Sequence, residues 1–302
     1  MDTELDTLAT ALYVRIDDLV KSDPRLSRWR PVVGICPKLS DAELLTVAVI
    51  QSLLGFTSER RFLRFARAHL VAAFPYLPDQ AGYNKRLRLA AAQMKVLIFL
   101  LARETDLFYD DVFVVDSTPV ECGRSRPTAK RSELVGFAGY GYCASHSRFF
   151  WGLRLHLLCT PSGLPVAFAL AHPKADEREV LRDLLEIDPA LLRPGQVIIA
   201  DKGYTSAELD RFLAEHGIEL LRPAKANEVP RPGAAFLKPL RQLIESVNDT
   251  LKGQLDLERH GGRTGGGVIA RVCQRLLAYV ATIWFNRQTC QPTTRSLVAY
   301  DH

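Results

Sequence analysis

Two short apolar runs that each end in an aspartate place the strongest constraint on the fold of this 302-residue chain. The first run is VFVVD, which ends at Asp116, and the second is VIIAD, which ends at Asp201. Short continuous runs rich in Val and Ile are typical of strands that are buried on both faces of a sheet. Neighbouring strands lie about 4.8 Å apart. If these two strands are parallel neighbours, both carboxylates emerge at one edge of the sheet and repel each other unless a cation lies between them.

The second part of the chain alternates between predicted strands and predicted helices. Further strands are expected over residues 148–160, 164–172 and 218–223, and helices over residues 175–187, 206–217, 236–255 and 268–286. Early strands joined by short turns indicate antiparallel pairing, and later strand–helix–strand crossovers indicate parallel pairing. This order predicts an α/β fold with a mixed RNase H-like sheet flanked by helices. Residues 123–147 show little pattern and are expected to form a loop.

The first hundred residues predict helices only. Ser40, with Glu43 three residues later, predicts a capping box, and residues 84–104 predict one strong helix of about 20 residues. No spacing in this region is specific enough to identify a helix-turn-helix. We expect three segments: a helical, DNA-binding N-terminal domain over residues 1–108, an RNase H-like catalytic domain over residues 109–290, and a tail over residues 291–302.

The net charge of +5 is weak evidence by itself, but its distribution is informative. Residues 59–103 contain nine basic and two acidic side chains, and residues 124–154 contain six basic and one acidic. Clustered positive charge attracts polyanions, and so favours nucleic acid as a partner. Within the first cluster, Arg60, Arg61 and Arg64 repeat along one predicted helix, where they either follow DNA phosphates or form an ordinary solvated face.

Other sequence features exclude several classes of protein. The six cysteines are scattered without a CxxC pair, which excludes a disulfide framework or a zinc ribbon. No run approaches the roughly 18 apolar residues that cross a membrane, and the acidic start lacks the order of a signal peptide. We therefore expect a cytoplasmic protein without membrane contact. His146 and His156 are interpreted as structural side chains rather than metal ligands.

A third acid lies on the polar face of the helix expected after residue 236. Helical spacing aligns Arg241, Glu245 and Lys252 on this face, opposite a row of leucine, isoleucine and valine side chains. One interpretation is a solvated face with an Arg241–Glu245 ion pair. The other makes Glu245 a third carboxylate beside Asp116 and Asp201, in an oxygen-rich site that suits Mg²⁺ or Mn²⁺.

Three motifs resemble the DDE transposases of bacterial insertion sequences. They are D-S-T at Asp116, D-K-G-Y from Asp201 to Tyr204, and R-x3-E-x6-K at Arg241, Glu245 and Lys252. The resemblance covers about residues 111–286. In relatives with the fuller third motif a tyrosine stands where this chain has Lys238.

The resemblance implies a site and a reaction. Asp116, Asp201 and Glu245 would form a catalytic triad that binds two Mg²⁺ or Mn²⁺ ions, and Arg241 and Lys252 would hold DNA phosphates. Water would cleave the phosphodiester at the element end, and the freed 3′-hydroxyl would join target DNA without a covalent protein–DNA intermediate. The implied partners are the terminal inverted repeats, target DNA and a second copy of the chain in the synaptic complex, at the bacterial nucleoid.

Some roles remain open at this stage. Lys202 and Tyr204 either contact DNA or shape the turn after Asp201. The alternatives to a transposase are an RNase H-like nuclease that cuts without joining and an inactive DNA-binding derivative. A recombinase with Tyr204 as nucleophile is a further alternative, but it would leave the carboxylate pattern without a role.

Overall fold

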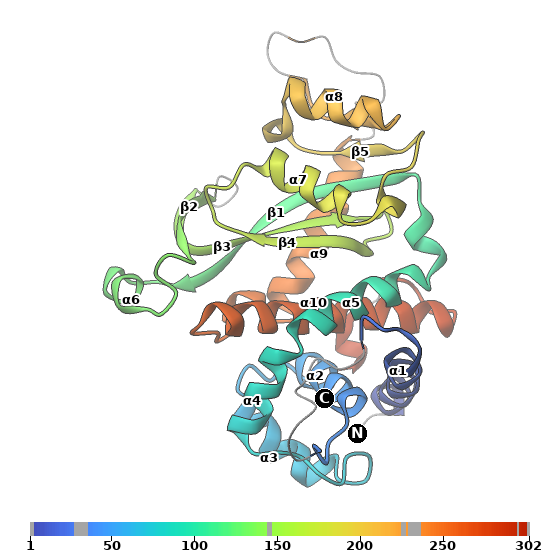
Figure 1. The fold of residues 1–302 in the computed structure, drawn as a ribbon, viewed down its shortest axis with the longest axis vertical. Helices are drawn as coiled ribbons and strands as arrows, with labels where there is room; N and C mark the ends of the chain where they lie inside the picture. The colour runs from blue at the N-terminus through green and yellow to red at the C-terminus, as the bar shows by residue number, and fades with distance from the viewer. Residues whose placement is uncertain are drawn as a thin grey trace. The chain divides into compact units, whose positions relative to one another are not determined.

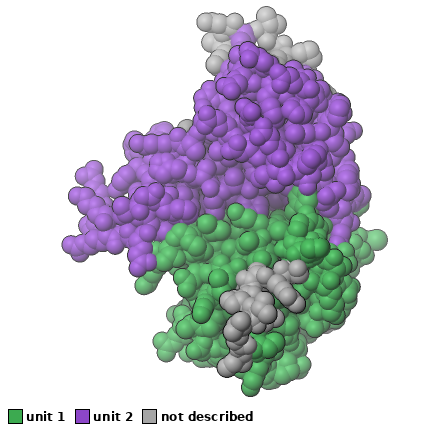
Figure 2. Space-filling view, viewed as in Figure 1, with its two compact units in different colours: residues 1–101, 251–302 green, residues 102–250 purple. Residues whose placement is uncertain are grey.

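A computed structural model describes residues 3–26, 36–143, 147–224, 228, 237–294 and 296–300. The chain forms two compact units. Unit 1 contains residues 1–101 and 251–302, and unit 2 contains residues 102–250 (Figure 2). The units divide the chain differently from the three segments expected above, because the C-terminal residues belong with the N-terminal helices. The assignment of DNA binding and catalysis to separate segments stays a prediction.

Unit 2 is built on a mixed sheet (Figure 1). Its strands are β1 (Val112–Gly123), β2 (Gly139–Cys143), β3 (Arg148–Cys159), β4 (Pro165–Ala171), β5 (Val197–Ile199) and β6 (Glu219–Leu221). Strand β3 pairs antiparallel with β1, β2 and β4, whereas β5 is parallel to both β1 and β6. Helix α7 (Glu177–Glu186) packs on β3 and β4, and α8 (Ala207–Glu215) packs on β6. The predicted α/β class, a mixed sheet flanked by helices after an all-helical region, is confirmed.

The parallel pairing of β1 with β5 carries the two aspartate runs. Val112 pairs with Val197, Phe113 with Ile198, and Val114 with Ile199. Phe113 and Ile198 are fully buried, as expected for strands covered on both faces. The predicted adjacency of VFVVD and VIIAD is therefore confirmed.

The segment predicted to be a loop, residues 123–147, contains the short helix α6 (Arg126–Arg131) and strand β2. Strand β2 reads GYGYC, so glycines rather than apolar side chains alternate with tyrosines. A Cβ at Gly139 would lie 2.1 Å from His172 Nε2, and one at Gly141 would lie 2.7 Å from the Phe150 ring. The sequence did not predict this strand because glycines, rather than apolar side chains, occupy its inward-facing positions. These glycines leave room for the His172 and Phe150 rings.

Unit 1 is helical. Its helices include α1 (Thr3–Ser22), α2 (Asp41–Leu53), α3 (Glu59–His69), α4 (Gln80–Leu89), most of α5 (Ala91–Arg103), and α10 (Gly265–Gln288). The capping box of Ser40 and Glu43 at the start of α2 is confirmed. The single helix predicted over residues 84–104 is wrong, since α4 ends at Leu89 and α5 begins at Ala91, with Ala90 between them. Alanine is the best helix former, so packing around the fully buried Ala90 sets this break rather than residue propensity.

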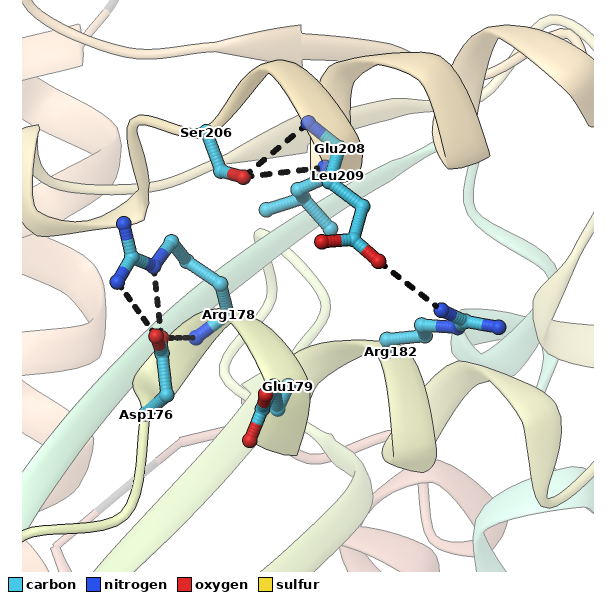
Figure 3. A pocket seen from close by; sticks show the side chains of 7 residues that line it. All are labelled: Asp176, Arg178, Glu179, Arg182, Ser206, Glu208 and Leu209. Carbon is cyan, nitrogen blue, oxygen red and sulfur yellow. Dashed lines mark hydrogen bonds and ion pairs between the residues drawn. The ribbon is translucent and has the colours of Figure 1, made fainter.

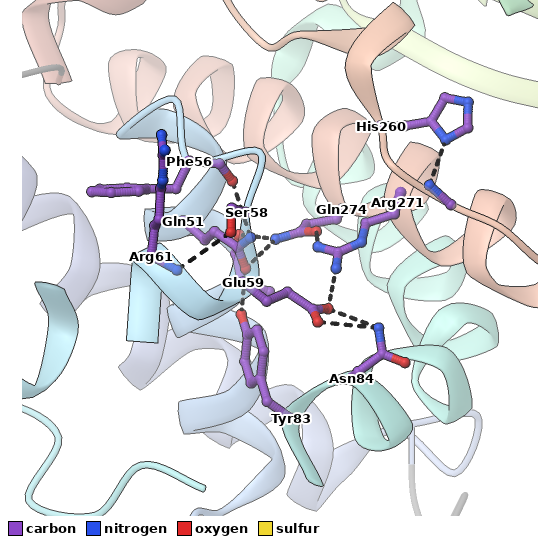
Figure 4. A network of polar contacts seen from close by, with 12 residues as sticks. Gln51, Phe56, Ser58, Glu59, Arg61, Tyr83, Asn84, His260, Arg271 and Gln274 are labelled. Atoms are coloured by element: carbon purple, nitrogen blue, oxygen red, sulfur yellow. Dashed lines mark hydrogen bonds and ion pairs between the residues drawn. The ribbon is translucent and has the colours of Figure 1, made fainter. Parts of the chain in front are cut away.

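Helix α10 is the central helix of unit 1, where it contacts α1, α2 and α4. Among the described helices it has the length and composition to cross a membrane, but 94% of its apolar window is buried inside the structure. This burial is typical of a core helix. Its polar side chains are also paired: Arg271 forms a buried ion pair with Glu59, which also accepts a hydrogen bond from Asn84 at 2.9 Å, and Gln274 donates to Gln51 at 3.2 Å (Figure 4).

Candidate active site

The candidate site lies in unit 2, at the edge of the sheet where β5 ends. Continuing the β1–β5 register by two residues beyond the Val114–Ile199 pair places Asp116 beside Asp201. Asp116 lies within β1, which continues past this point along β3. Asp201 caps the short 3-10 helix η3 (Lys202–Tyr204), and its Oδ1 accepts a hydrogen bond from the Gly203 amide at 2.7 Å. The two carboxylates therefore share one sheet edge.

The electrostatic state of Asp116 reflects this crowding. The Asp116 side chain is largely buried, and this burial raises its pKa to about 6, whereas a hydrogen bond from the Ser117 backbone amide lowers it. The charges of Asp201 and Glu177 raise this pKa further, and the charge of Arg241 lowers it. Carboxylate oxygens that repel each other at an accessible edge are a donor set that fits a hard divalent cation such as Mg²⁺ or Mn²⁺.

A carboxylate that the sequence analysis did not single out, Glu177, also belongs to this site. It is the first residue of α7, and its Oε1 accepts hydrogen bonds from Ser117 Oγ at 2.7 Å and from Arg154 Nη1 at 2.5 Å. Arg154 Nη2 donates in turn to the Tyr142 carbonyl at 2.9 Å. The run of acids around Asp176 indicated only a helix N-terminus, because acids in the first turn are common there.

Helix α9 (Leu237–Gly253) reaches Asp116 through Asn248. Asn248 is buried, and its Nδ2 donates to Asp116 Oδ2 at 3.0 Å. Glu245 lies three residues earlier on the same helix face and is exposed, and Arg241 lies four residues before that. One residue of the polar face of α9 thus contacts the sheet directly.

The three acids of the predicted triad are not gathered around one point. Among the residues that the structure describes, no three Asp, Glu, His or Cys side chains lie close enough together to hold a metal ion. Asp116 and Asp201 adjoin each other, whereas Glu245 is placed only through its neighbour Asn248. The role of Glu245 as a ligand remains a prediction.

Several buried polar atoms around these acids have no hydrogen-bond partner within the described chain. They are Tyr204 Oη, both ring nitrogens of His156, and Asn248 Oδ1. Burial and then the charges of Glu177, Asp116 and Asp201 raise the pKa of Tyr204 well above its ordinary value. Burial lowers the pKa of His156 to about 4, so its ring is neutral at pH 7. Unpartnered buried polar atoms point to an ordered water or ion that completes the site.

The burial of Tyr204 corrects one interpretation. Its ring is 1% exposed, so it is not accessible for stacking on DNA in this conformation. Lys202 in the same turn is exposed, as are Arg60, Arg61 and Arg64 on α3 of unit 1. These side chains are accessible to DNA, but contact with it stays a prediction. Lys252 is half-buried in the last turn of α9, and His146 lies outside the described residues.

A polar pocket of about 300 Å³ lies between the starts of α7 and α8 (Figure 3). Its arginines are already paired: Arg178 binds Asp176, and Arg182 binds Glu186 at 3.0 Å and Glu208 at 3.7 Å. With acids neutralising both guanidinium groups, the pocket does not offer a free positive charge to a phosphate.

The comparisons agree with the motifs. A family model described as the transposase DDE domain matches residues 108–281, more than half of the chain. No significant match was found among curated proteins or among solved structures.

Proposed function

Because the chain belongs to the DDE transposase family, we propose that it cleaves DNA at the ends of an insertion sequence and joins the freed 3′-hydroxyl to target DNA. The observation that carries this proposal is the parallel register that sets Asp116 beside Asp201 at one sheet edge. Both steps are phosphoryl transfers at a phosphodiester, so one site can serve for both. An RNase H-like nuclease that cuts without joining is the alternative outcome of the experiment below.

Asp116, Asp201 and Glu245 would hold two Mg²⁺ or Mn²⁺ ions. When bound, such ions activate the attacking oxygen and stabilise the leaving oxygen of an in-line displacement. The protein contributes the fixed positions of its ligands. Asn248 orients Asp116 by donating to Oδ2, and the Gly203 amide orients Asp201 by donating to Oδ1.

Glu245 would complete the site from α9. Its exposed side chain is free to turn toward the sheet, and the bond from Asn248 to Asp116 already holds the neighbouring helical turn in place. The ligand set would close when cations neutralise the repulsion among the acids. Arg241, whose charge already acts on Asp116, would then contact a phosphate oxygen of the scissile strand, and Lys252 a further one.

The proposed partners follow from the reaction. Double-stranded element ends and target DNA are the substrates, and the exposed basic residues Arg60, Arg61, Arg64 and Lys202 would add phosphate contacts. Synapsis of two ends requires two copies of the chain, and the reaction would take place at the nucleoid in the bacterial cytoplasm.

The test is incubation of the purified full chain with its own flanking element ends, Mg²⁺ and a supercoiled target plasmid. Joined products establish a transposase. Cleaved ends without joined products would replace the proposal with a nuclease, and binding without either product would indicate an inactive derivative. An EDTA control separates metal-dependent cleavage from contaminating activity.

A further inference from the structure

We propose that Glu177 is a fourth carboxylate of the metal site, binding the cation that Asp201 binds. This inference rests on the proposed function. Glu177 Oε1 is satisfied by Ser117 Oγ and Arg154 Nη1, whereas Oε2 accepts no hydrogen bond from the described residues. The side chain is 23% exposed, so Oε2 is accessible to an ion from solvent.

Gly203 shows where this free oxygen points. A Cβ on Gly203 would lie 2.9 Å from Asp201 Oδ1 and 3.1 Å from Glu177 Oε2. Oxygens from two different elements, the turn after β5 and the start of α7, thus converge on one point above the glycine. A side chain at this position would have to displace both carboxylates. Convergence of two negative oxygens is costly unless a cation compensates it.

The unpartnered groups around Glu177 are an independent sign of a missing ligand. Tyr204 and His156 are each 1% exposed and carry buried polar atoms without partners in the described chain. Glu177 is the acid whose charge acts most strongly on both of them. A hydrated cation between Glu177 and Asp201 would bring water molecules that can donate to the imidazole and accept from the phenol.

Arg154 fixes the orientation of this carboxylate. Its guanidinium donates to Glu177, to Ser117 Oγ at 3.1 Å and to the Tyr142 carbonyl, so it is held from three directions. This arrangement directs Glu177 Oε2 toward Asp201 and leaves it as the ligand atom. Arg154 is therefore a positioning residue for Glu177.

The test is Mn²⁺ binding to the full chain without DNA, measured by titration calorimetry and by the spin-resonance signal of free Mn²⁺. Glu177→Gln should weaken Mn²⁺ binding by about 10-fold or more. The matched control is Glu179→Gln, an exposed acid in the same helical turn, which should bind Mn²⁺ like the wild type. Wild-type affinity in Glu177→Gln would overturn the inference, provided that Asp201→Asn loses Mn²⁺. Unchanged binding in Asp201→Asn as well would instead reject the proposed metal site.

A second measurement avoids variants that fail to fold. Fe²⁺ bound in place of Mg²⁺, with ascorbate and peroxide, cleaves the polypeptide near its ligands. In the wild-type chain we expect cuts near Asp116, Asp201 and Glu177. Cuts near the two aspartates without any near Glu177 would overturn the inference.

A separate observation concerns the exposed aromatic face of β2 and the start of β3. Tyr140, Tyr142 and Phe149 are 51%, 47% and 77% exposed. Tyr142 and Phe149 are cross-strand partners whose ring centroids lie 5.0 Å apart, and Tyr140 lies two residues from Tyr142 on the same face. Three large rings on one exposed face are uncommon on a surface without a partner.

From its chemistry we infer that this face stacks unpaired bases of the DNA end, an inference that also rests on the proposed function. Aromatic rings beside positive charge are the usual platform for unpaired nucleotides. Residues 124–154 contain six basic side chains and one acidic side chain. Arg154 joins Tyr142 directly to Glu177 and Ser117, next to Asp116. Phe149 lies eight residues from Leu157, the β3 partner of Asp116, so the rings lie about 26 Å along the strand from the candidate active site, a distance that several unpaired nucleotides would span.

The test uses an element-end duplex with unpaired terminal nucleotides, one of them the fluorescent base 2-aminopurine. Wild-type protein should quench its fluorescence, and the double variant Tyr140→Ala, Phe149→Ala should lose the quenching and bind this end about 10-fold more weakly. Tyr109→Ala, which removes an equally exposed ring from the same unit, is the control. Retained quenching, or a change in dimerisation without a change in DNA affinity, would overturn the inference. Absence of any DNA binding by the wild type would reject the proposed function instead.

Discussion

Asn248 on α9 donates a hydrogen bond to Asp116 on β1 at 3.0 Å, and so joins residues 132 positions apart in the sequence. This bond fixes one face of the helix that carries Glu245 against the strand that carries the first aspartate. Asn248 therefore links the two segments that a metal site would need to hold together.

Loss of this link should weaken the site. Asn248→Ala should lower both Mn²⁺ affinity and the rate of Mg²⁺-dependent cleavage by about 10–100-fold, since groups that orient metal ligands contribute on this scale. Asp249→Ala, a change at the exposed neighbouring position, is the control. Equal effects of the two substitutions would show that helix stability, rather than orientation of Asp116, is responsible.

Neutral replacements of the triad should each abolish the reaction. Asp116→Asn, Asp201→Asn and Glu245→Gln remove the negative charge with little change in shape, so metal-dependent cleavage should fall to the level seen in EDTA. Binding to element ends, measured by gel shift, should be largely retained. Any variant that still cleaves would remove its residue from the triad. Glu245→Gln is the most stringent of the three tests, because the contact between this part of α9 and the sheet is made by Asn248.

The pH dependence of stability offers a test of the Asp116 environment without DNA. The pKa of Asp116 is raised to about 6, so its protonated form is favoured in the folded state. This stabilisation is fully present below about pH 4 and is lost as the pH rises through 6. In EDTA, Asp116→Asn should therefore be more stable than the wild type at pH 7, by on the order of 2 kcal/mol, and the difference should vanish near pH 4.

Chemical denaturation at both pH values measures this difference in the free energy of unfolding. Asp111→Asn, at an exposed position just before β1, should show no such pH dependence. A difference of the same size at pH 4 and pH 7 would mean that Asp116 is not titrating in this range.

The salt dependence of DNA binding tests the role of the arginine and lysine of the third motif. If Arg241 and Lys252 each contact one phosphate, Arg241→Gln and Lys252→Gln should each reduce the slope of log affinity against log salt by about 1. Lys21→Gln, on an exposed lysine paired with Asp17, is the comparison. Slopes that match the wild type would favour the solvated-face interpretation of α9.

The core of unit 1 should depend on a buried ion pair. Glu59→Gln leaves the Arg271 guanidinium buried without its counter-charge, and should destabilise the protein by about 3–5 kcal/mol. Adding Arg271→Met to this variant should recover much of the loss, because the uncompensated charge is then removed. Denaturation with guanidinium chloride measures the free energy of unfolding of the single and the double variant. If Arg271→Met does not restore stability, the packing of the Glu59 side chain, rather than its charge, is the dominant contribution.

Patterns in the local sequence predicted the parts of the site that depend on strand burial. The apolar runs before Asp116 and Asp201 predicted two buried strands, and their expected parallel pairing is confirmed. Glu177 was not predicted as part of the site, because an acid in the first turn of a helix has an ordinary explanation as a cap. Its position depends on a contact with Arg154, 23 residues away, that no periodicity reveals.

Tertiary packing explains the remaining differences. Asn248 lies on the polar face of α9, yet its side chain is buried where it donates a hydrogen bond to Asp116. Tyr204 was expected either to contact DNA or to shape the turn after Asp201, and its ring is buried. A sequence identifies the types of residue on a face, whereas the neighbouring element determines whether that face meets water.

The placement of α10 has a consequence for biosynthesis. Unit 2 occupies a continuous stretch of chain between the two portions of unit 1, so all of its strands leave the ribosome before α10 is made. The acids of the candidate site are therefore made before the central helix of unit 1. The N-terminal helices are made first, but their core is completed last. The reason is that Glu59 pairs with Arg271, which belongs to the C-terminal portion of unit 1. A chain that ended before Gly265 would keep all three acids but leave Glu59 without Arg271, its buried ion-pair partner.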